Sequence, residues 1–161
     1  MSAPSHYPLP DAALVREMFG VLFDGLTVKP GPKFDLGPKS SSYCAVYVTD
    51  ENAPGAFCVC DMAFAANAGA ALSMLPPPVA KEAAKNRVLN EVMSANLREV
   101  MNIATRLLLR ENTPHLRLEE VYPVAALPAA AQAALAAAPH RVDFETSLGK
   151  YGVGMLAAVS L

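Results

Sequence analysis

Residues 79–111, VAKEAAKNRVLNEVMSANLREVMNIATRLLLRE, contain neither glycine nor proline and are rich in good helix formers. This composition predicts one continuous helix. At ~1.5 Å of rise per residue the helix would be roughly 45–50 Å long, which is more than the radius of a small domain. We therefore expect this stretch to be the central element of the fold, against which the rest of the chain packs.

The apolar residues of this predicted helix fall on one side. At ~100° of turn per residue they form a stripe, made of Leu89, Val92, Met93, Leu97, Val100, Met101, Ile103, Ala104, Leu107 and Leu108. The opposite side is predicted to face solvent and carries Arg87, Glu91, Ser94, Arg98, Asn102 and Thr105. Glu99 lies at the boundary, about 60° from Asn102, because three residues make ~300° of turn. We expect Glu99 and Asn102 to be neighbours on an accessible ridge, with Ala95 and Arg106 one turn away on either side.

Upstream of this helix the sequence alternates between helical and β-type segments. Residues 1–10 carry three prolines, which predicts an extended lead-in. Asp11 can cap a helix that ends at Gly25, and residues 26–28 can form a short strand. Residues 43–50 and 56–64 are β-type runs joined by a Pro-Gly turn, which predicts an antiparallel hairpin. A short helix over residues 64–75 then ends at three prolines.

Downstream, residues 115–122 are predicted to form a strand and the alanine-rich residues 127–139 a helix. Residues 141–148 and 151–161 are predicted to form a closing hairpin around Gly149-Lys150. This order of elements predicts an α+β fold, an antiparallel sheet with long helices packed on one face. The length of 161 residues predicts one domain over residues 11–161 after the lead at residues 1–10.

Composition excludes several classes of function. The formal net charge is −2 and 53% of residues are hydrophobic, so binding of nucleic acid through bulk positive charge is disfavoured. The apolar runs are too short to cross a bilayer, and the amino terminus lacks the charged and apolar regions of a signal peptide. We expect a cytoplasmic protein that binds neither nucleic acid nor a membrane.

The residues that most often carry chemistry do not form an internal active site in the sequence. Cys44, Cys58 and Cys60 are expected to be small buried hydrophobes on neighbouring strands, because they lack the second ligand pair of a zinc site. The three histidines stand far apart, so no metal is expected. There is also no glycine-rich phosphate loop, and no serine or cysteine nucleophile with a base in reach.

The segment at residues 89–108, LNEVMSANLREVMNIATRLL, contains Glu99-Val100-Met101-Asn102 and resembles the Glu-x-x-Asn signature of the CheC/CheX chemotaxis phosphatases. The order of predicted elements resembles that family over essentially the whole chain. It runs from an opening helix and a short strand ending in Pro-Gly, through a hairpin, a short helix and the motif helix, to a strand ending in proline and a closing hairpin. The opening helix has Glu17 but Gly20 in place of an Asn, so the chain resembles the single-motif CheX branch.

This resemblance implies dephosphorylation of a CheY-like response regulator in chemotaxis or two-component signalling. It implies that Glu99 pairs with the active-site lysine of the regulator, and that Asn102 enters the site and orients the attacking water. It implies no cofactor of the chain's own, since Mg²⁺ is expected on the partner regulator. Ala95, Arg98 and Arg106 complete the expected binding surface.

Three positions depart from the family pattern and keep other functions open. Ala95 stands where Asp or Ser is usual, Arg106 stands where a small residue is common, and Pro123 follows Asn102 slightly too closely. The first hypothesis is an aspartyl-phosphate phosphatase. The second is a catalytically degenerate CheX-like adaptor for a response regulator or a flagellar switch component. The third is a structural protein of the same architecture that binds no phosphorylated partner.

The last predicted strand, at residues 151–161, is apolar on both of its faces and ends the chain. A strand exposed at the edge of a sheet can pair with a copy of itself. CheX-type proteins are dimers, so the resemblance also implies a homodimer. The alternative is that this strand lies in the middle of the sheet.

Overall fold

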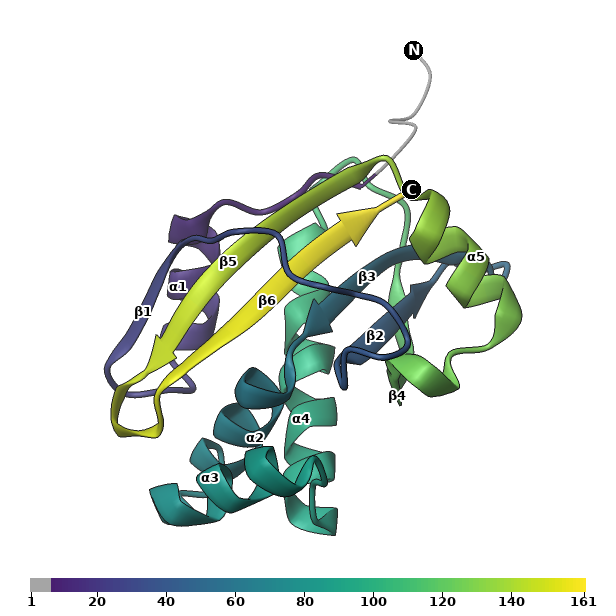
Figure 1. Cartoon of the computed structure of the whole chain (residues 1–161). Coiled ribbons are helices and arrows are strands. Elements are labelled where there is room, and N and C mark those ends of the chain that lie inside the picture. The colour runs from purple at the N-terminus through teal and green to yellow at the C-terminus, as the bar shows by residue number, and fades with distance from the viewer. Residues whose placement is uncertain (1–6) are drawn as a thin grey trace.

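In the computed structural model, the described part of the chain, residues 7–161, contains one six-stranded sheet in which every pairing is antiparallel (Figure 1). The strand order is β1-β5-β6-β3-β2-β4. The strands are β1 (Leu26–Pro30), β2 (Tyr43–Val48), β3 (Pro54–Cys60), β4 (Arg117–Pro123), β5 (His140–Leu148) and β6 (Val153–Ser160). The α+β class, the antiparallel sheet and both predicted hairpins are confirmed.

The helices connect these strands. They are α1 (Ala12–Gly20), α2 (Met62–Ala71), α3 (Pro77–Asn86), α4 (Glu91–Ala104) and α5 (Ala129–Ala137), with short 3₁₀ turns η1 (Thr105–Leu108), η2 (Val124–Ala126) and η3 (Gly149–Tyr151). Helix α2 begins earlier than the predicted residue 64 because the Asp61 side chain caps it, accepting a hydrogen bond from the Phe64 amide at 2.8 Å.

The single long helix predicted over residues 79–111 is wrong, because the chain breaks between α3 and α4. Arg87 adopts the left-handed conformation at φ 56°, and the amide of Val88 bonds the carbonyl of Ala83 at 3.1 Å, which ends α3 as a Schellman motif. Asn90 then caps α4 by accepting from the Met93 amide at 2.8 Å. Helix-forming composition alone did not reveal this break, although an Asn directly before Glu91 is a start signal.

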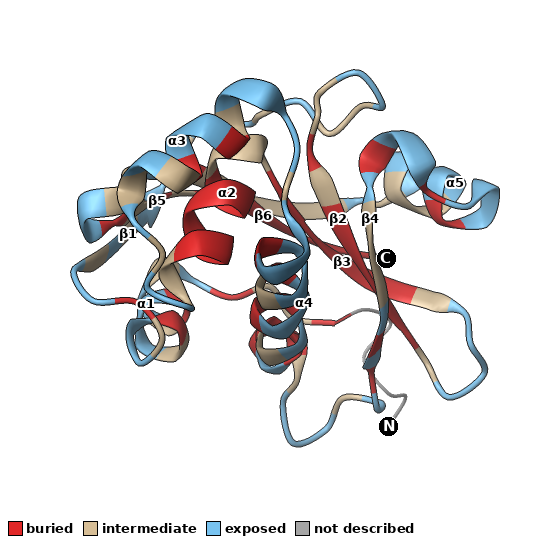
Figure 2. Cartoon of the chain, turned by 90° about the horizontal axis from the view of Figure 1, so that it is seen from below, coloured by how far each residue is buried: buried red, intermediate tan, exposed pale blue. Residues whose placement is uncertain are grey.

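The two faces of the sheet are covered unequally. Helices α1 to α4 lie on one face, where α2 is almost wholly buried and α4 turns an exposed side to solvent (Figure 2). Helix α5 packs on the opposite face through Ala131 and Leu135, against alternate residues of β2, β3 and β6. Helices therefore cover both faces of the sheet. The expected layer lies on one face, and the alanine-rich helix α5 covers the other.

Strand β6 does not lie at an edge. It is bonded to β3 on one side and to β5 on the other, so its apolar character reflects a central position in the sheet. The expectation of self-pairing through this strand is therefore wrong, and the edges of the sheet are β1 and β4. Residues 1–6 of the predicted lead lie outside the described residues, while Tyr7 is buried in the core.

Candidate functional site

The candidate site is the exposed side of α4, and the opposite side of this helix anchors it to the core. Met93, Leu97, Val100, Met101 and Ala104 are buried, as the predicted stripe requires. The stripe is wrong at its flanks. Val92 is 50% exposed, because the first turn of α4 places it about 120° from the centre of the buried residues, and Thr105 is buried, because the chain tightens into a 3₁₀ turn there.

Helix α2 supports the middle of α4 at close range. A Cβ atom at Gly69 would lie 2.8 Å from the carbonyl oxygen of Met93, so only glycine permits this approach. The Asn96 side chain crosses the same contact and donates hydrogen bonds to the Gly69 carbonyl at 2.8 Å and to Ser73 Oγ at 2.7 Å. These contacts fix the turn of α4 that precedes Glu99.

Strand β2 supports the end of α4. At Thr105 the backbone amide bonds the carbonyl of Asn102 as the helix tightens, which leaves the carbonyl of Met101 for another donor. The buried hydroxyl of Tyr47 takes that place and donates to it at 2.6 Å. The turn that carries Asn102 is therefore tied to the centre of the sheet.

The outer ridge consists of Ala95, Arg98, Glu99 and Asn102 of α4 and of Arg106 in η1, and all five residues are exposed. The side chains of Glu99 and Asn102 have no hydrogen bond or ion pair with any residue in the described part of the chain, so both are free to bind a partner. The predicted pair is therefore brought together on one accessible surface.

The two arginines of the outer ridge differ in their contacts. Arg98 turns away from the predicted pair toward β4, where its Nε lies 3.2 Å from Glu120 Oε1 and its Nη2 donates to the Glu119 carbonyl at 3.4 Å. Arg106 forms no ion pair with Glu99 within the described residues. The carboxylate of Glu99 is thus available, and Arg106 adds a positive charge that no described residue pairs, one turn beyond Asn102.

A cavity of about 390 Å³ lies beside the outer ridge, between α4 and β4. Ala95 and Arg98 line it on the helix side, and Glu120, Val121 and Pro123 line it on the strand side. Sequence patterns did not indicate this cavity, because it depends on how α4 crosses β4. The downstream proline of the family pattern nevertheless lies in its wall, which places that position next to the motif helix.

The cysteines offer no competing site. Cys44, Cys58 and Cys60 are fully buried free thiols, as expected. Burial raises the pKa of all three, to about 12 for Cys58, although a hydrogen bond with Tyr47 lowers the pKa of that thiol in part. Thiolate chemistry at neutral pH is therefore suppressed. Within residues 7–161, no three His, Cys, Asp or Glu side chains gather where they could hold a metal ion.

None of the helices in the described part of the chain has both the length and the apolar character that crossing a membrane requires.

No family model matches the chain, and no curated protein matches it. Solved structures do match the chain. One is a chain of the crystal structure of the CheX–CheY–BeF₃–Mg²⁺ complex from Borrelia burgdorferi, with a TM-score of 0.51 at 15% identity over 91% of this chain and 90% of that chain. Another is FliY from Thermotoga maritima, with a TM-score of 0.52 at 11% identity over 92% of this chain and 81% of that chain. The chain therefore has the CheC/CheX-type fold.

Proposed function

We propose that this protein is a CheX-like phosphatase that promotes hydrolysis of the aspartyl phosphate on a CheY-like response regulator. Glu99 pairs with the active-site lysine of the regulator and holds the two proteins in register. The Asn102 amide enters the phosphorylation pocket and orients a water molecule for attack on phosphorus. The water oxygen bonds to phosphorus as the bond between phosphorus and the aspartyl oxygen breaks, so inorganic phosphate leaves with the oxygen of water and the regulator recovers its carboxylate.

The observation that carries this proposal is the pair of unpartnered side chains, Glu99 and Asn102, on the outer ridge of a helix anchored by Asn96 and Tyr47. An aspartyl phosphate is already activated, and the regulator supplies Mg²⁺ and its own acidic pocket. A helper protein therefore needs only to position water. A neutral amide does this by hydrogen bonding, whereas a carboxylate would repel the phosphoryl oxygens.

Two other features support the proposal. One structure with this fold comes from a complex that contains both CheX and CheY. The cavity beside Ala95 and Pro123 gives the outer ridge a concave neighbour, into which a partner side chain can pack. A cytoplasmic location follows from the proposed partner. We also propose a homodimer in which the β1 strands of two copies pair. Pairing at this edge of the sheet leaves α4 uncovered.

Arg106 favours a second candidate function, an adaptor that binds the regulator without turnover. Its exposed and unpaired guanidinium lies one turn from Asn102, where it can contact the partner but also hold the amide away from the phosphoryl group. The two candidates share the same surface and differ in whether Asn102 reaches the reacting atoms.

The test follows decay of CheY-like regulators from the same organism after phosphorylation with a small phosphodonor. This chain contains no tryptophan, so it would not mask the fluorescence of a tryptophan placed in the regulator to report its state. We expect the wild-type protein to accelerate decay and Asn102→Ala to reduce the acceleration by about tenfold or more while binding persists. Glu99→Ala should weaken binding itself.

Glu82→Ala and Asn86→Ala provide matched controls, because they change the same residue types at exposed positions of α3. Binding without faster decay, together with gain of activity in Arg106→Gly, would support the adaptor. Equal decay with wild type and Asn102→Ala would refute the proposed role of the amide. Absence of binding to every regulator would leave only a structural role.

A further inference from the structure

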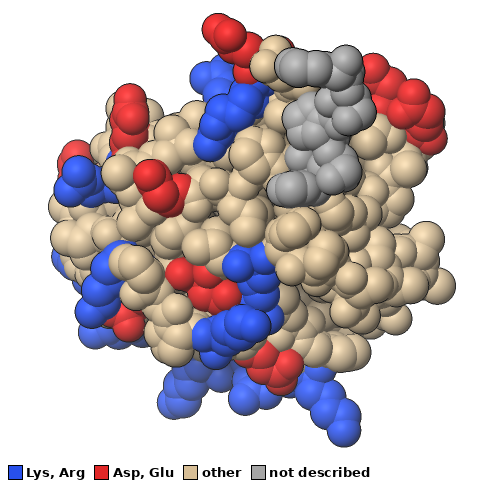
Figure 3. All heavy atoms as spheres, turned by 90° about the horizontal axis from the view of Figure 1, so that it is seen from above, with Lys and Arg blue, Asp and Glu red and all other residues tan. Residues whose placement is uncertain are grey.

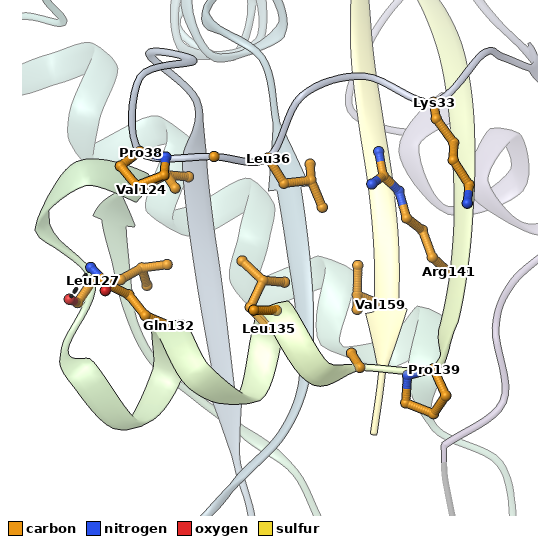
Figure 4. Close-up of a pocket in the computed structure, with 13 residues that line it drawn as sticks. Lys33, Leu36, Pro38, Val124, Leu127, Gln132, Leu135, Pro139, Arg141 and Val159 are labelled. Carbon is orange, nitrogen blue, oxygen red and sulfur yellow. Dashed lines mark hydrogen bonds between the residues drawn. The ribbon is translucent and has the colours of Figure 1, made fainter.

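A second cavity lies on the face of the sheet opposite α4. Its volume is about 500 Å³, within the usual range for small-molecule sites. The loop between β1 and β2 forms one wall, α5 and the segment after it form the other, and β6 contributes to the floor (Figure 4). Because α5 and α4 cover opposite faces of the sheet, this cavity is separate from the outer ridge (Figure 1).

The lining combines an apolar interior with positive charge at one end. The larger aliphatic side chains are Leu36, Val124, Leu127, Leu135 and Val159, and Pro38, Ala136, Ala138 and Pro139 add to the apolar lining. Figure 4 shows Lys33 and Arg141 together at the end of the cavity next to β5 and β6. No Asp or Glu side chain lines the cavity, although the chain as a whole carries a net charge of −2. Seen from above, the surface of the molecule has a broad area without Lys, Arg, Asp or Glu side chains. This area borders a group of basic and acidic side chains (Figure 3).

The neighbouring contacts hold Arg141 in place. Its Nε and Nη2 bond the two carboxylate oxygens of Asp143 at 2.8 and 2.7 Å, and Nη2 also donates to the Phe34 carbonyl at 2.5 Å. The guanidinium carbon lies 5.6 Å from the centre of the Phe34 ring. Arg141 is therefore preorganised on the cavity wall, and its charge is balanced by the buried Asp143.

Lys33 supplies a positive charge that Asp143 does not neutralise. It is exposed and forms no ion pair within residues 7–161. With Arg141 neutralised by Asp143, the net charge at this end of the cavity is +1. An apolar interior that opens beside an uncompensated cation is complementary to a molecule with one negative charge and an apolar body.

We propose that this cavity binds a small organic carboxylate with an apolar chain, whose carboxylate pairs with Lys33 and whose chain packs between Leu36, Leu135 and Val159. The nitrogen Nη1 of Arg141, which has no hydrogen bond with the described residues, can donate to the same carboxylate. This binding site does not depend on the proposed phosphatase function.

The experiment titrates the 161-residue chain with octanoate, below the micelle concentration of octanoate, and follows backbone amides by NMR. We expect saturable shifts confined to the loop around Leu36, to α5 and to the β6 residue Val159. Octanol, which has the same chain without the charge, should bind more weakly. Lys33→Glu should raise the dissociation constant for octanoate by about tenfold, because an attractive charge becomes repulsive.

Lys39→Glu is the matched control, because Lys39 is exposed in the same loop but does not line the cavity. We expect it to change affinity by less than about twofold. The absence of saturable shifts, equal affinity for octanol, or equal effects of the two lysine variants would each overturn the proposal. Shifts centred on α4 would also overturn it, because they would place octanoate on the other face of the sheet.

Discussion

Replacing Tyr47 with Phe tests whether the sheet holds the end of α4 in place. The substitution removes one hydroxyl and keeps the aromatic ring in the core. The hydrogen bond lost to the Met101 carbonyl is short, 2.6 Å, and this carbonyl stays buried; the hydroxyl's contact with the Cys58 thiol is lost as well. A hydrogen bond of this kind contributes about 1 kcal/mol, and an unsatisfied buried carbonyl costs about 1–3 kcal/mol. We therefore expect Tyr47→Phe to lower the free energy of unfolding by about 1–3 kcal/mol.

Urea denaturation measures this change, and amide hydrogen exchange locates it. Exchange should accelerate at residues 101–105, where the helix tightens. Tyr122→Phe is the control, because that hydroxyl bonds Glu119 at 2.8 Å on the surface and its loss should change stability by less than about 0.5 kcal/mol. If Tyr47→Phe were as stable as the control, the bond to Met101 would not anchor α4.

Two other substitutions test the packing and the buried thiols. Gly69→Ala should destabilise the protein by about 1–3 kcal/mol in thermal unfolding, because the new Cβ meets Met93 at 2.8 Å, whereas Gly20→Ala, with no atom within 4 Å, should not destabilise it. Burial raises the pKa of Cys58 to about 12 from an ordinary value of 9.0. The folded state therefore keeps a proton that the unfolded state loses, and stability should fall as pH rises above 9, by up to about 1.4 kcal/mol per pH unit for each such thiol. Cys58→Ala should flatten that decline in urea titrations between pH 9 and 11, and an unchanged slope would contradict the argument.

Local signals were sufficient for most of the sheet. The two β-type runs with a turn signal between them predict the pairing of β2 and β3, although the turn lies at residues 49–53 and the predicted Pro54-Gly55 turn is wrong, because these two residues begin β3. The break between α3 and α4 was missed because Arg87 takes a left-handed conformation that glycine usually adopts, so composition gave no warning. The position of β6 was misjudged for another reason. An apolar strand is equally consistent with an edge that pairs and with a centre already paired, and only the full strand order separates them.

For the candidate site, helical periodicity predicted the exposure of Glu99 and Asn102, because both lie away from the apolar stripe that packs on the core. It could not predict that Arg98 turns toward Glu120, since that partner belongs to a strand about twenty residues away. It also could not predict either cavity, because each forms between segments distant in sequence. Exposure is thus encoded locally, whereas the shape and charge around an exposed residue depend on tertiary packing.

The two buried or partly buried hydrogen bonds that anchor α4 do not involve its outer ridge. Asn96 bonds α2, and Tyr47 bonds the backbone at Met101, so neither contact uses a residue of the outer ridge. The backbone position of Asn102 is therefore set independently of the side chains that surround it on the surface. It follows that a phosphatase and an adaptor can share this scaffold and differ only at positions such as Ala95 and Arg106. Substitutions at Ala95 and Arg106 should change turnover while leaving the free energy of unfolding almost unaltered, because neither side chain is buried.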